Sequence, residues 1–277
     1  MAPVPIRPIE NGFSMFSLSV RRGAPEIAAR EPFDGKSLWL PAAFLCFLVI
    51  PFGWIGVFAP AIWLGLVAME SAHGWKKAIS FLITGLLMLL VNSGVVPGNE
   101  HILLMEPYRD ASANLIYPSF RPAKAVIALT IVLFMLVRPQ PLKRNDLPWI
   151  ALAIALPIAL AAMVLDFAPK LTATIALAAL LNFVVVCIAE EGFFRWVLQR
   201  GLGLWLKRWP WIATILVTLL FVSLHTGWAA SSTMLALVGV AGFGYALLWQ
   251  LRGSFWACVL AHWGVNLLHM TLLAYPG

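Results

Sequence analysis

Nine apolar segments follow one another along most of the chain, and they limit what it can fold into. Most are long enough to cross a hydrocarbon layer of about 30 Å as helices. A backbone in lipid must satisfy its own hydrogen bonds, and these segments lack the alternation of apolar and polar residues that a membrane barrel requires. The sequence therefore predicts an all-α fold, a polytopic transmembrane helix bundle with eight or nine spans. The expected segments are 38–52, 56–69, 78–96, 123–137, 149–167, 171–190, 211–226, 232–251 and 254–273.

The composition agrees with a membrane protein and excludes several other classes. Apolar residues make up 61% of the chain and charged residues 11%, whereas a soluble globular chain has about 45–50% and about 25%. This excludes a soluble enzyme, a DNA-binding module, a disordered scaffold and a disulfide-stapled secreted domain. The 19 basic residues form no dense run, so we expect the lipid bilayer, and no nucleic acid, as a partner. The three cysteines lie in apolar segments and are expected to be small buried hydrophobes.

The distribution of Lys and Arg predicts how the helices are oriented. Residues 1–37 are polar and are interpreted as a loosely ordered tail, followed by N-terminal transmembrane helices over 38–170. The first two apolar segments could form one broken helix, or a hairpin that turns near Pro51 to Gly53. The hairpin puts fifteen of the 19 basic residues on the side of the tail, whereas a single span divides them almost evenly. Because positive residues concentrate in the cytoplasm, we predict nine spans, a cytoplasmic N-terminus and a C-terminus outside.

Two adjacent acids lie where an apolar run ends, in the motif Glu190-Glu191-x-x-x-Arg195. Ionisable residues inside membrane spans are costly and are candidates for function. Glu191 and Arg195 are four residues apart and can pair on a helix, whereas Glu190 points about 100° away and is left without that partner. An unpaired carboxylate at low dielectric binds a proton more readily, which suits a group that takes and returns protons. The alternative is a structural ion pair at a helix end, with the second acid facing water.

Two further motifs place histidines in apolar spans. One is Phe221-x-x-x-His225, and the other is His262-x-x-x-Asn266, whose two polar residues share a helical face. A single histidine is more often a hydrogen-bonded packing residue than a catalyst. Counted from the expected cytoplasmic helix ends, however, Glu190 and His262 lie at a depth of about 15 Å, and the other two polar residues at about 21 Å. We therefore expect the acid, imidazole and amide groups in one layer near the middle of the membrane.

The three motifs, in this order over about the last 100 residues, resemble the signature of the CPBP family. This family comprises the type II CAAX prenyl endopeptidases and their bacterial relatives associated with bacteriocin immunity. The resemblance covers residues 171–273, which it implies to be a catalytic helical core. Residues 1–170 match only as additional spans.

The resemblance implies a glutamate-dependent intramembrane endopeptidase of a type formerly classed as a metalloprotease. In it, Glu190 would activate a water with help from His225, and His262 and Asn266 would form the oxyanion hole. The supporting residues, which would hold the helix and orient the acid, are Glu191 and Arg195. The chain has no HExxH motif, so no cofactor is expected, and zinc held by Glu and His is the weaker alternative.

The implied substrate is a membrane-anchored peptide or protein, cleaved near its C-terminus, and the expected location is the inner (plasma) membrane of a bacterium. Two other interpretations of the same residues stay open. A transporter would use them to line a proton or ion path, although no inverted repeat is visible in the sequence. A catalytically inactive immunity or chaperone protein could share the fold, although the complete set of Glu, His, His and Asn counts against it.

Overall fold

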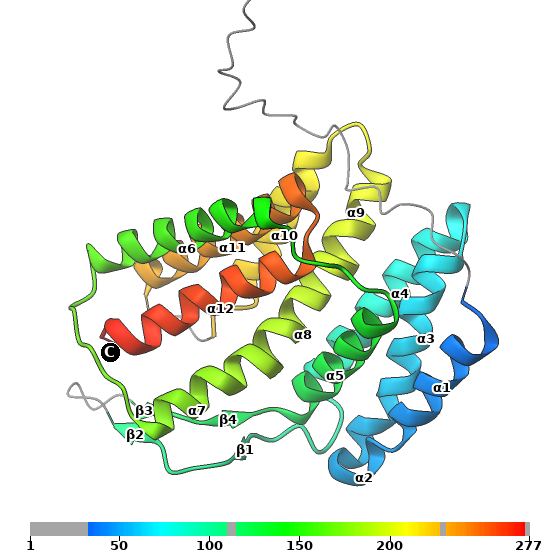
Figure 1. The fold of residues 1–277 in the computed structure, drawn as a ribbon, viewed down its shortest axis with the longest axis horizontal. Coiled ribbons are helices and arrows are strands. Elements are labelled where there is room, and N and C mark those ends of the chain that lie inside the picture. The colour runs from blue at the N-terminus through cyan, green and yellow to red at the C-terminus, as the bar shows by residue number, and fades with distance from the viewer. Residues whose placement is uncertain (1–32, 110–114, 228–230, 275–277) are drawn as a thin grey trace, which may run out of the picture.

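The computed structural model describes residues 33–109, 115–227 and 231–274 of the chain. Helices dominate these residues (Figure 1), which confirms the predicted all-α class. The first half contains α1 (Gly35–Cys46), α2 (Val49–Phe52), the 3-10 helix η1 (Gly53–Val57), α3 (Phe58–Ser71), α4 (Gly74–Asn92), α5 (Pro122–Val137), the 3-10 helix η2 (Arg144–Asp146) and α6 (Leu147–Ala162). The second half contains α7 (Ala173–Leu181), the π-helix η3 (Asn182–Cys187), α8 (Ile188–Glu191), the π-helix η4 (Gly192–Gln199), α9 (Arg200–Trp205), α10 (Pro210–Ser223), α11 (Ser232–Arg252) and α12 (Phe255–Leu272).

Several of these helices are long and apolar enough to cross a membrane. Six segments meet that condition, and two shorter apolar helices, α5 and α10, accompany them. The chain is therefore an integral membrane protein. The prediction of eight or nine spans is not confirmed, because length and composition alone give six. The six segments are Gly35–Ser71, Gly74–Asn92, Arg144–Ala162, Ala173–Trp205, Ser232–Arg252 and Phe255–Leu272.

The first of these segments folds back on itself. The indole N–H of Trp63 in α3 donates to the carbonyl oxygen of Leu38 in α1 at 2.9 Å, although 25 residues would extend about 37 Å along a straight helix. The turn begins at Gly53, which has a positive φ of 53°, a conformation that favours glycine. A Cβ atom on Gly56 would lie 2.3 Å from the carbonyl oxygen of Leu48. The predicted hairpin is therefore present, with two glycines where the backbone reverses.

The predicted polar tail over 1–37 is only partly visible, because residues 1–32 lie outside the described part of the chain. At its end the helix α1 already begins at Gly35, earlier than expected from the apolar pattern. Asp34 explains the earlier start, since its carboxylate accepts a hydrogen bond from the backbone N–H of Ser37 at 2.7 Å. This is the usual arrangement of a helix N-cap.

The long connection between α4 and α5 contains strands that the sequence analysis did not predict. β1 (Ile102–Leu103) pairs antiparallel with β4 (Ser119–Phe120), and β2 (Tyr108–Arg109) pairs with β3 (Leu115–Ile116). The resulting hairpin packs on the first turns of α7, where Ile116 joins a buried cluster with Ile175 and Ala178. Pairs of two residues each are too short to produce a readable alternation in a sequence.

The segments from α7 to α9 form one long, slanting helical rod in the middle of the molecule (Figure 1). Helices α4 and α5 pack on one side of this rod, and α10, α11 and α12 on the other. Aromatic rings fill the interior toward its α9 end: Trp196 of the rod lies 6.0 Å from Phe134 of α5 and 6.0 Å from Trp249 of α11, between ring centres. The rod therefore presents its side chains to both groups of helices at once.

Candidate active site

The helical rod is longer than the apolar pattern suggested, and the charged motif lies inside it. The predicted segment ended at Glu190, whereas the helix continues from Ala173 through Trp205. Thr172 caps its start by accepting from the backbone N–H of Ile175 at 3.2 Å. Glu190 and Glu191 occupy the α-helical turn α8, between two stretches of π-helix. Such π-helical insertions occur frequently at functional sites.

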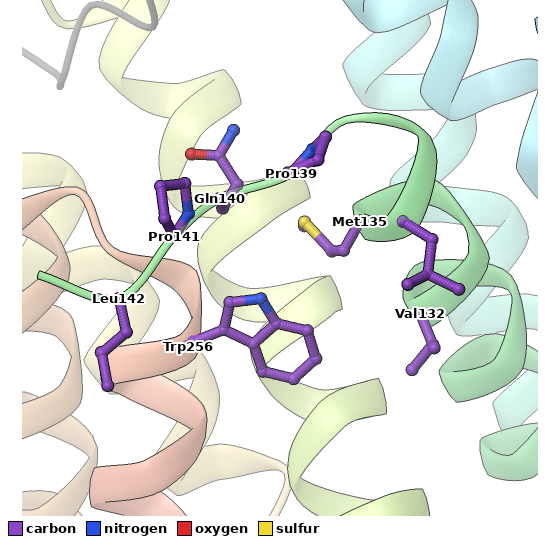
Figure 2. A pocket seen from close by; sticks show the side chains of 8 residues that line it. Val132, Met135, Pro139, Gln140, Pro141, Leu142 and Trp256 are labelled. Carbon is purple, nitrogen blue, oxygen red and sulfur yellow. The ribbon is translucent and has the colours of Figure 1, made fainter.

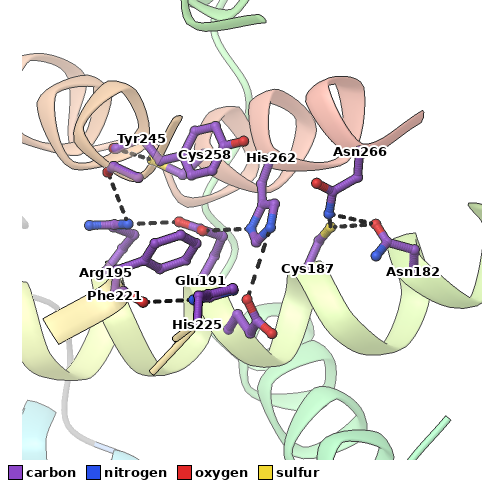
Figure 3. A network of polar contacts seen from close by, with 12 residues as sticks. Asn182, Cys187, Glu191, Arg195, Phe221, His225, Tyr245, Cys258, His262 and Asn266 are labelled. Carbon is purple, nitrogen blue, oxygen red and sulfur yellow. Dashed lines mark hydrogen bonds and ion pairs between the residues drawn. The ribbon is translucent and has the colours of Figure 1, made fainter. Parts of the chain in front are cut away.

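Glu191 is fully buried and has bonding partners on both carboxylate oxygens. One oxygen, Oε2, accepts from Nε of Arg195 at 2.9 Å, and the side chains of both residues have 0% exposure. The other, Oε1, lies 2.9 Å from Nδ1 of His262 on α12 (Figure 3). The predicted pairing of Glu191 with Arg195 is therefore present, and Glu191 also bonds to a second helix, α12, through His262.

Arg195 is held in turn by a chain of buried hydrogen bonds. Its guanidinium donates to Oε1 of Gln199 at 3.0 Å and to the carbonyl oxygen of Gly242 in α11 at 3.4 Å. Gln199 then donates to the hydroxyl of Thr214 in α10 and to the carbonyl oxygen of Ala246 in α11. These bonds tie the rod to α10 and α11, and they satisfy groups that would be costly to bury alone.

Glu190 is not left without a charged partner, which corrects the prediction made from the helical spacing. Its Oε1 lies 2.5 Å from the ammonium nitrogen of Lys124 in α5. Lys124 is 66 residues earlier in the chain, so spacing on one helix could not reveal it. The other oxygen, Oε2, accepts no hydrogen bond from the residues that the structure describes, and it faces Nε2 of His262 at 3.9 Å.

Gly192 allows α5 to approach the rod next to these acids. A Cβ atom on Gly192 would lie 2.8 Å from Cγ1 of Ile131, a buried α5 residue. Real Cβ contacts are not that short, so any larger residue here would push α5 away. The glycine inside the Glu-Glu-Gly sequence therefore helps to bring Lys124 within reach of Glu190.

His225 lies in the turn directly after α10 rather than inside the helix. Its Nδ1 is 2.6 Å from the carbonyl oxygen of Phe221, and its ring stacks on the Phe221 ring with 4.3 Å between centres. Because a carbonyl oxygen only accepts, Nδ1 carries a proton and donates this hydrogen bond. His225 is also close enough to Glu190 for the two groups to interact electrostatically.

His262 links the two glutamates of the rod. Its ring stacks on Tyr245 with 4.8 Å between centres and meets Phe221 edge-on at 5.9 Å. These contacts hold the ring so that Nδ1 faces Glu191 and Nε2 faces Glu190. Glu190, His225 and His262 therefore come from separate parts of the chain and lie near one another.

Asn266 lies one turn along α12 from His262 and contacts a different part of the rod. Its amide nitrogen donates to Oδ1 of Asn182 at 3.0 Å and lies 3.9 Å from the sulfur of Cys187 (Figure 3). Cys187 itself donates to Asn182 at 3.2 Å. The sequence analysis missed Asn182, although a lone amide within an apolar run was a visible signal.

The comparison with known families follows the same residues. The C-terminal part of the chain, residues 172–268, matches the family model described as Type II CAAX prenyl endopeptidase Rce1-like. This part of the chain is therefore similar to the CPBP family. The match suggests the activity of a CAAX-type intramembrane protease. No curated protein and no solved structure matches the chain significantly.

The family match contains all the residues that the three motifs singled out, but it leaves out part of the observed site. Glu190, Glu191, Arg195 and the two histidines fall within 172–268. Lys124 lies outside it, on a helix of the N-terminal part. The candidate site is therefore assembled from the matched helices and from one helix that the match does not cover.

Side chains already balance the charges of the two glutamates. Glu190 pairs with Lys124 and Glu191 with Arg195, so a metal cation at either carboxylate would have to displace an existing partner. Within 33–109, 115–227 and 231–274, no three His, Cys, Asp or Glu side chains form a group that could hold a metal ion.

A separate apolar groove lies at the far end of α5 (Figure 2). It is open to the surroundings and lined by Val132, Met135, Leu136, Pro139, Gln140, Pro141, Leu142 and Trp256. None of the residues of the glutamate and histidine cluster lines this groove. The groove is therefore distinct from the candidate active site.

Proposed function

We propose that this protein is a glutamate-dependent intramembrane endopeptidase that hydrolyses membrane-associated peptides or proteins near their C-termini. One observation carries the proposal: Oε2 of Glu190 accepts no hydrogen bond from a described residue and faces Nε2 of His262 at 3.9 Å. That separation is too long for a direct hydrogen bond. A water molecule can bridge polar groups at such a separation, and a water held there is in contact with a carboxylate base.

The proposed reaction uses Glu190 and His225 to activate the water. The water oxygen attacks the carbonyl carbon of the scissile peptide, and its proton passes to the Glu190 carboxylate. When the C–N bond breaks, this proton is delivered to the leaving amine, so that the carboxylate is restored. We propose that His225 shares this proton through Nε2, since its Nδ1 is bonded to the Phe221 carbonyl oxygen.

His262 and Asn266 are proposed to stabilise the oxyanion that forms on the peptide carbonyl. Nε2 of His262 faces Glu190, and a proton on this nitrogen would let it donate to the oxyanion. The amide nitrogen of Asn266 has two hydrogens, and its contact with the sulfur of Cys187 at 3.9 Å is weak enough for a substrate oxygen to replace it. Removing one oxyanion donor from an enzyme typically costs about 10² to 10³ in rate.

The test of this proposal is Glu190→Gln in purified protein reconstituted in liposomes. Gln keeps the shape of the side chain and removes the proton acceptor, so cleavage should fall to background. The probes are membrane-anchored peptides with a CAAX C-terminus, prenylated and unprenylated, followed by mass spectrometry. Glu100→Gln, in the exposed connection after α4, is the matched control and should cleave normally. Cleavage by Glu190→Gln at near wild-type rate would refute the mechanism.

We also propose that the reaction needs no resident metal. Strong chelators should then leave proteolysis intact, and purified active protein should lack stoichiometric zinc. Zinc near one per chain, with activity lost on chelation and restored by added metal, would replace this proposal with a metalloprotease.

A further inference from the structure

Lys124 is the part of the site that neither the motifs nor the family match includes. It lies in the first turn of α5, and its ammonium nitrogen is 2.5 Å from Oε1 of Glu190. The exposed fractions of the two side chains are 25% and 14%, so the pair is mostly withdrawn from its surroundings. Placing a lysine at such a position is costly and calls for a reason.

The other cations near Glu190 are already engaged. Arg195 is bound to Glu191, Gln199 and the Gly242 carbonyl oxygen, and His262 bonds to Glu191 through Nδ1. Glu190 therefore has Lys124 as its nearest permanent positive charge among the described residues. The ammonium also binds one particular oxygen, Oε1, and leaves Oε2 facing His262.

We propose that Lys124 is a positioning residue for the reaction, keeping Glu190 ionised and its Oε2 turned toward the attacking water. This inference rests on the proposed function, in which Glu190 is the base. A carboxylate buried without a cation takes up a proton from water, and a protonated Glu190 cannot accept another one. Lys124, which lies in the N-terminal part of the chain, thus supplies the positive charge that keeps Glu190 of the matched region ionised and able to act as a base.

A purely structural role for the ion pair makes different predictions. If Lys124 only fastens α5 to the rod, its loss weakens the fold without altering how activity depends on pH. If it sets the ionisation of Glu190, its loss changes the pH profile while substrate binding is maintained. The pH profile therefore separates the two roles.

The experiment compares Lys124→Met, Lys124→Gln and Lys124→Arg with the wild-type protein, using kcat and KM from pH 5 to 10. At neutral pH the two uncharged variants should lose about 10² in kcat or more, with KM within a few-fold of wild type. Their activity should recover as the pH rises, because the unpaired carboxyl group ionises only there. Lys124→Arg keeps a cation and should retain most of the activity and the wild-type profile.

Arg121→Met is the matched control, because Arg121 begins the same helix and bonds to His101 rather than to Glu190. It removes one positive charge nearby and should leave the pH profile unchanged. An unchanged profile in both Lys124→Met and Lys124→Gln, with both variants folded by thermal unfolding, would overturn the inference. An equal shift in Arg121→Met would also overturn it, since that result attributes the effect to general charge.

A second readout works without any substrate. Infrared difference spectra of Lys124→Met at neutral pH should show the C=O stretch of a protonated carboxylic acid. The band should be absent from the wild-type protein and from the double variant Lys124→Met/Glu190→Gln. If the band appears but the wild-type protein cleaves no peptide, the ion-pair assignment stands and the proposed protease function fails. If the wild-type protein cleaves peptides but no band appears in Lys124→Met, the proposed protease function stands and the role assigned to Lys124 fails.

Discussion

Glu190 and Glu191 are adjacent in the chain, and the surrounding helices give them different chemistry. Both oxygens of Glu191 are engaged, by Arg195 and His262, and its side chain is fully buried. Glu190 has one oxygen on Lys124 and one that accepts no hydrogen bond from a described residue and faces His262 at 3.9 Å. A carboxylate with a spare oxygen can take a proton, whereas a carboxylate bonded on both sides can only hold its neighbours in place. In the proposed mechanism, Glu190 therefore acts as the base and Glu191 holds the surrounding side chains in place.

Glu191→Gln should destabilise the protein far more than Glu190→Gln does. It leaves the Arg195 guanidinium buried without its counter-ion, and breaking a buried pair in this way costs about 3–5 kcal/mol. Lys124, the partner of Glu190, is 25% exposed and can turn toward more polar surroundings when its partner is neutralised. Thermal unfolding of both variants in the same detergent checks this. Equal unfolding temperatures of the two variants would show that the Glu191–Arg195 pair contributes no more stability than the Glu190–Lys124 pair.

His101 should make the attachment of the β-hairpin depend on pH. Its Nε2 accepts from Arg121 at 3.0 Å, and its Nδ1 lies 3.2 Å from the hydroxyl of Ser119. Burial, followed by the positive charges of Arg121 and Lys124, lowers the pKa of His101 below its usual 6.5. The unfolded segment thus binds more protons just below pH 6.5, so the stabilisation is complete above that pH and is lost as the pH falls through the folded value.

Hydrogen exchange of residues 102–109 and 115–120, corrected for the intrinsic effect of pH, measures this attachment. In the wild-type protein, protection should fall as the solution is acidified below pH 6.5. His101→Gln can accept from Arg121 without titrating, and its protection should stay constant. A parallel loss in both proteins would contradict the role assigned to His101.

At the level of elements, close helix contacts at glycines determine where the site residues lie. A Cβ atom on Gly242 of α11 would lie 2.6 Å from Cδ1 of Phe221, the residue that holds His225. Two residues along, a Cβ on Gly244 would come no closer than 3.8 Å to its nearest neighbour. The two positions therefore form a matched pair on one helix.

Gly242→Ala should displace the Phe221 ring and with it His225, costing about 1–3 kcal/mol by overpacking and reducing proteolysis. Gly244→Ala should be neutral or stabilising by about 0.5–1 kcal/mol, because alanine is the better helix former. Unfolding temperature and cleavage rate of the two variants test the difference. Comparable behaviour of both would mean that the Phe221 contact does not position the histidine.

The sequence was sufficient for the helices and the motif residues, but not for their partners across the bundle. Apolar length and charge counting predicted the helices and the turn at Gly53, and the spacing of four residues predicted the pair of Glu191 with Arg195. Lys124 could not be found in this way, since its ion pair depends on how α5 packs against the rod. The π-helical stretches and the two-residue strands likewise arise from tertiary packing, which leaves no periodic signal in the chain.

At the scale of the whole molecule, the arrangement of charges predicts the orientation in the membrane. A reporter fused after Lys207 should behave as cytoplasmic, and one fused after Gly277 as exported, because fifteen of the 19 basic residues then lie inside. Phosphatase and fluorescent-protein fusions at both positions provide the measurement. Finding both reporters on the same side would refute the nine-span topology and the cytoplasmic N-terminus.

The two short helices beside the rod have a consequence for the surrounding lipid. At 1.5 Å per residue, α5 and α10, with 16 and 14 residues, reach only about 24 Å and 21 Å, against a hydrocarbon core of about 30 Å. The lipid chains next to such short apolar surfaces compress, because the polar ends of the helices would otherwise be exposed to the hydrocarbon core. We therefore expect the bilayer to be thinner next to the helices that carry Lys124 and Phe221. A thinner hydrocarbon layer at that place shortens the path by which water reaches a buried carboxylate.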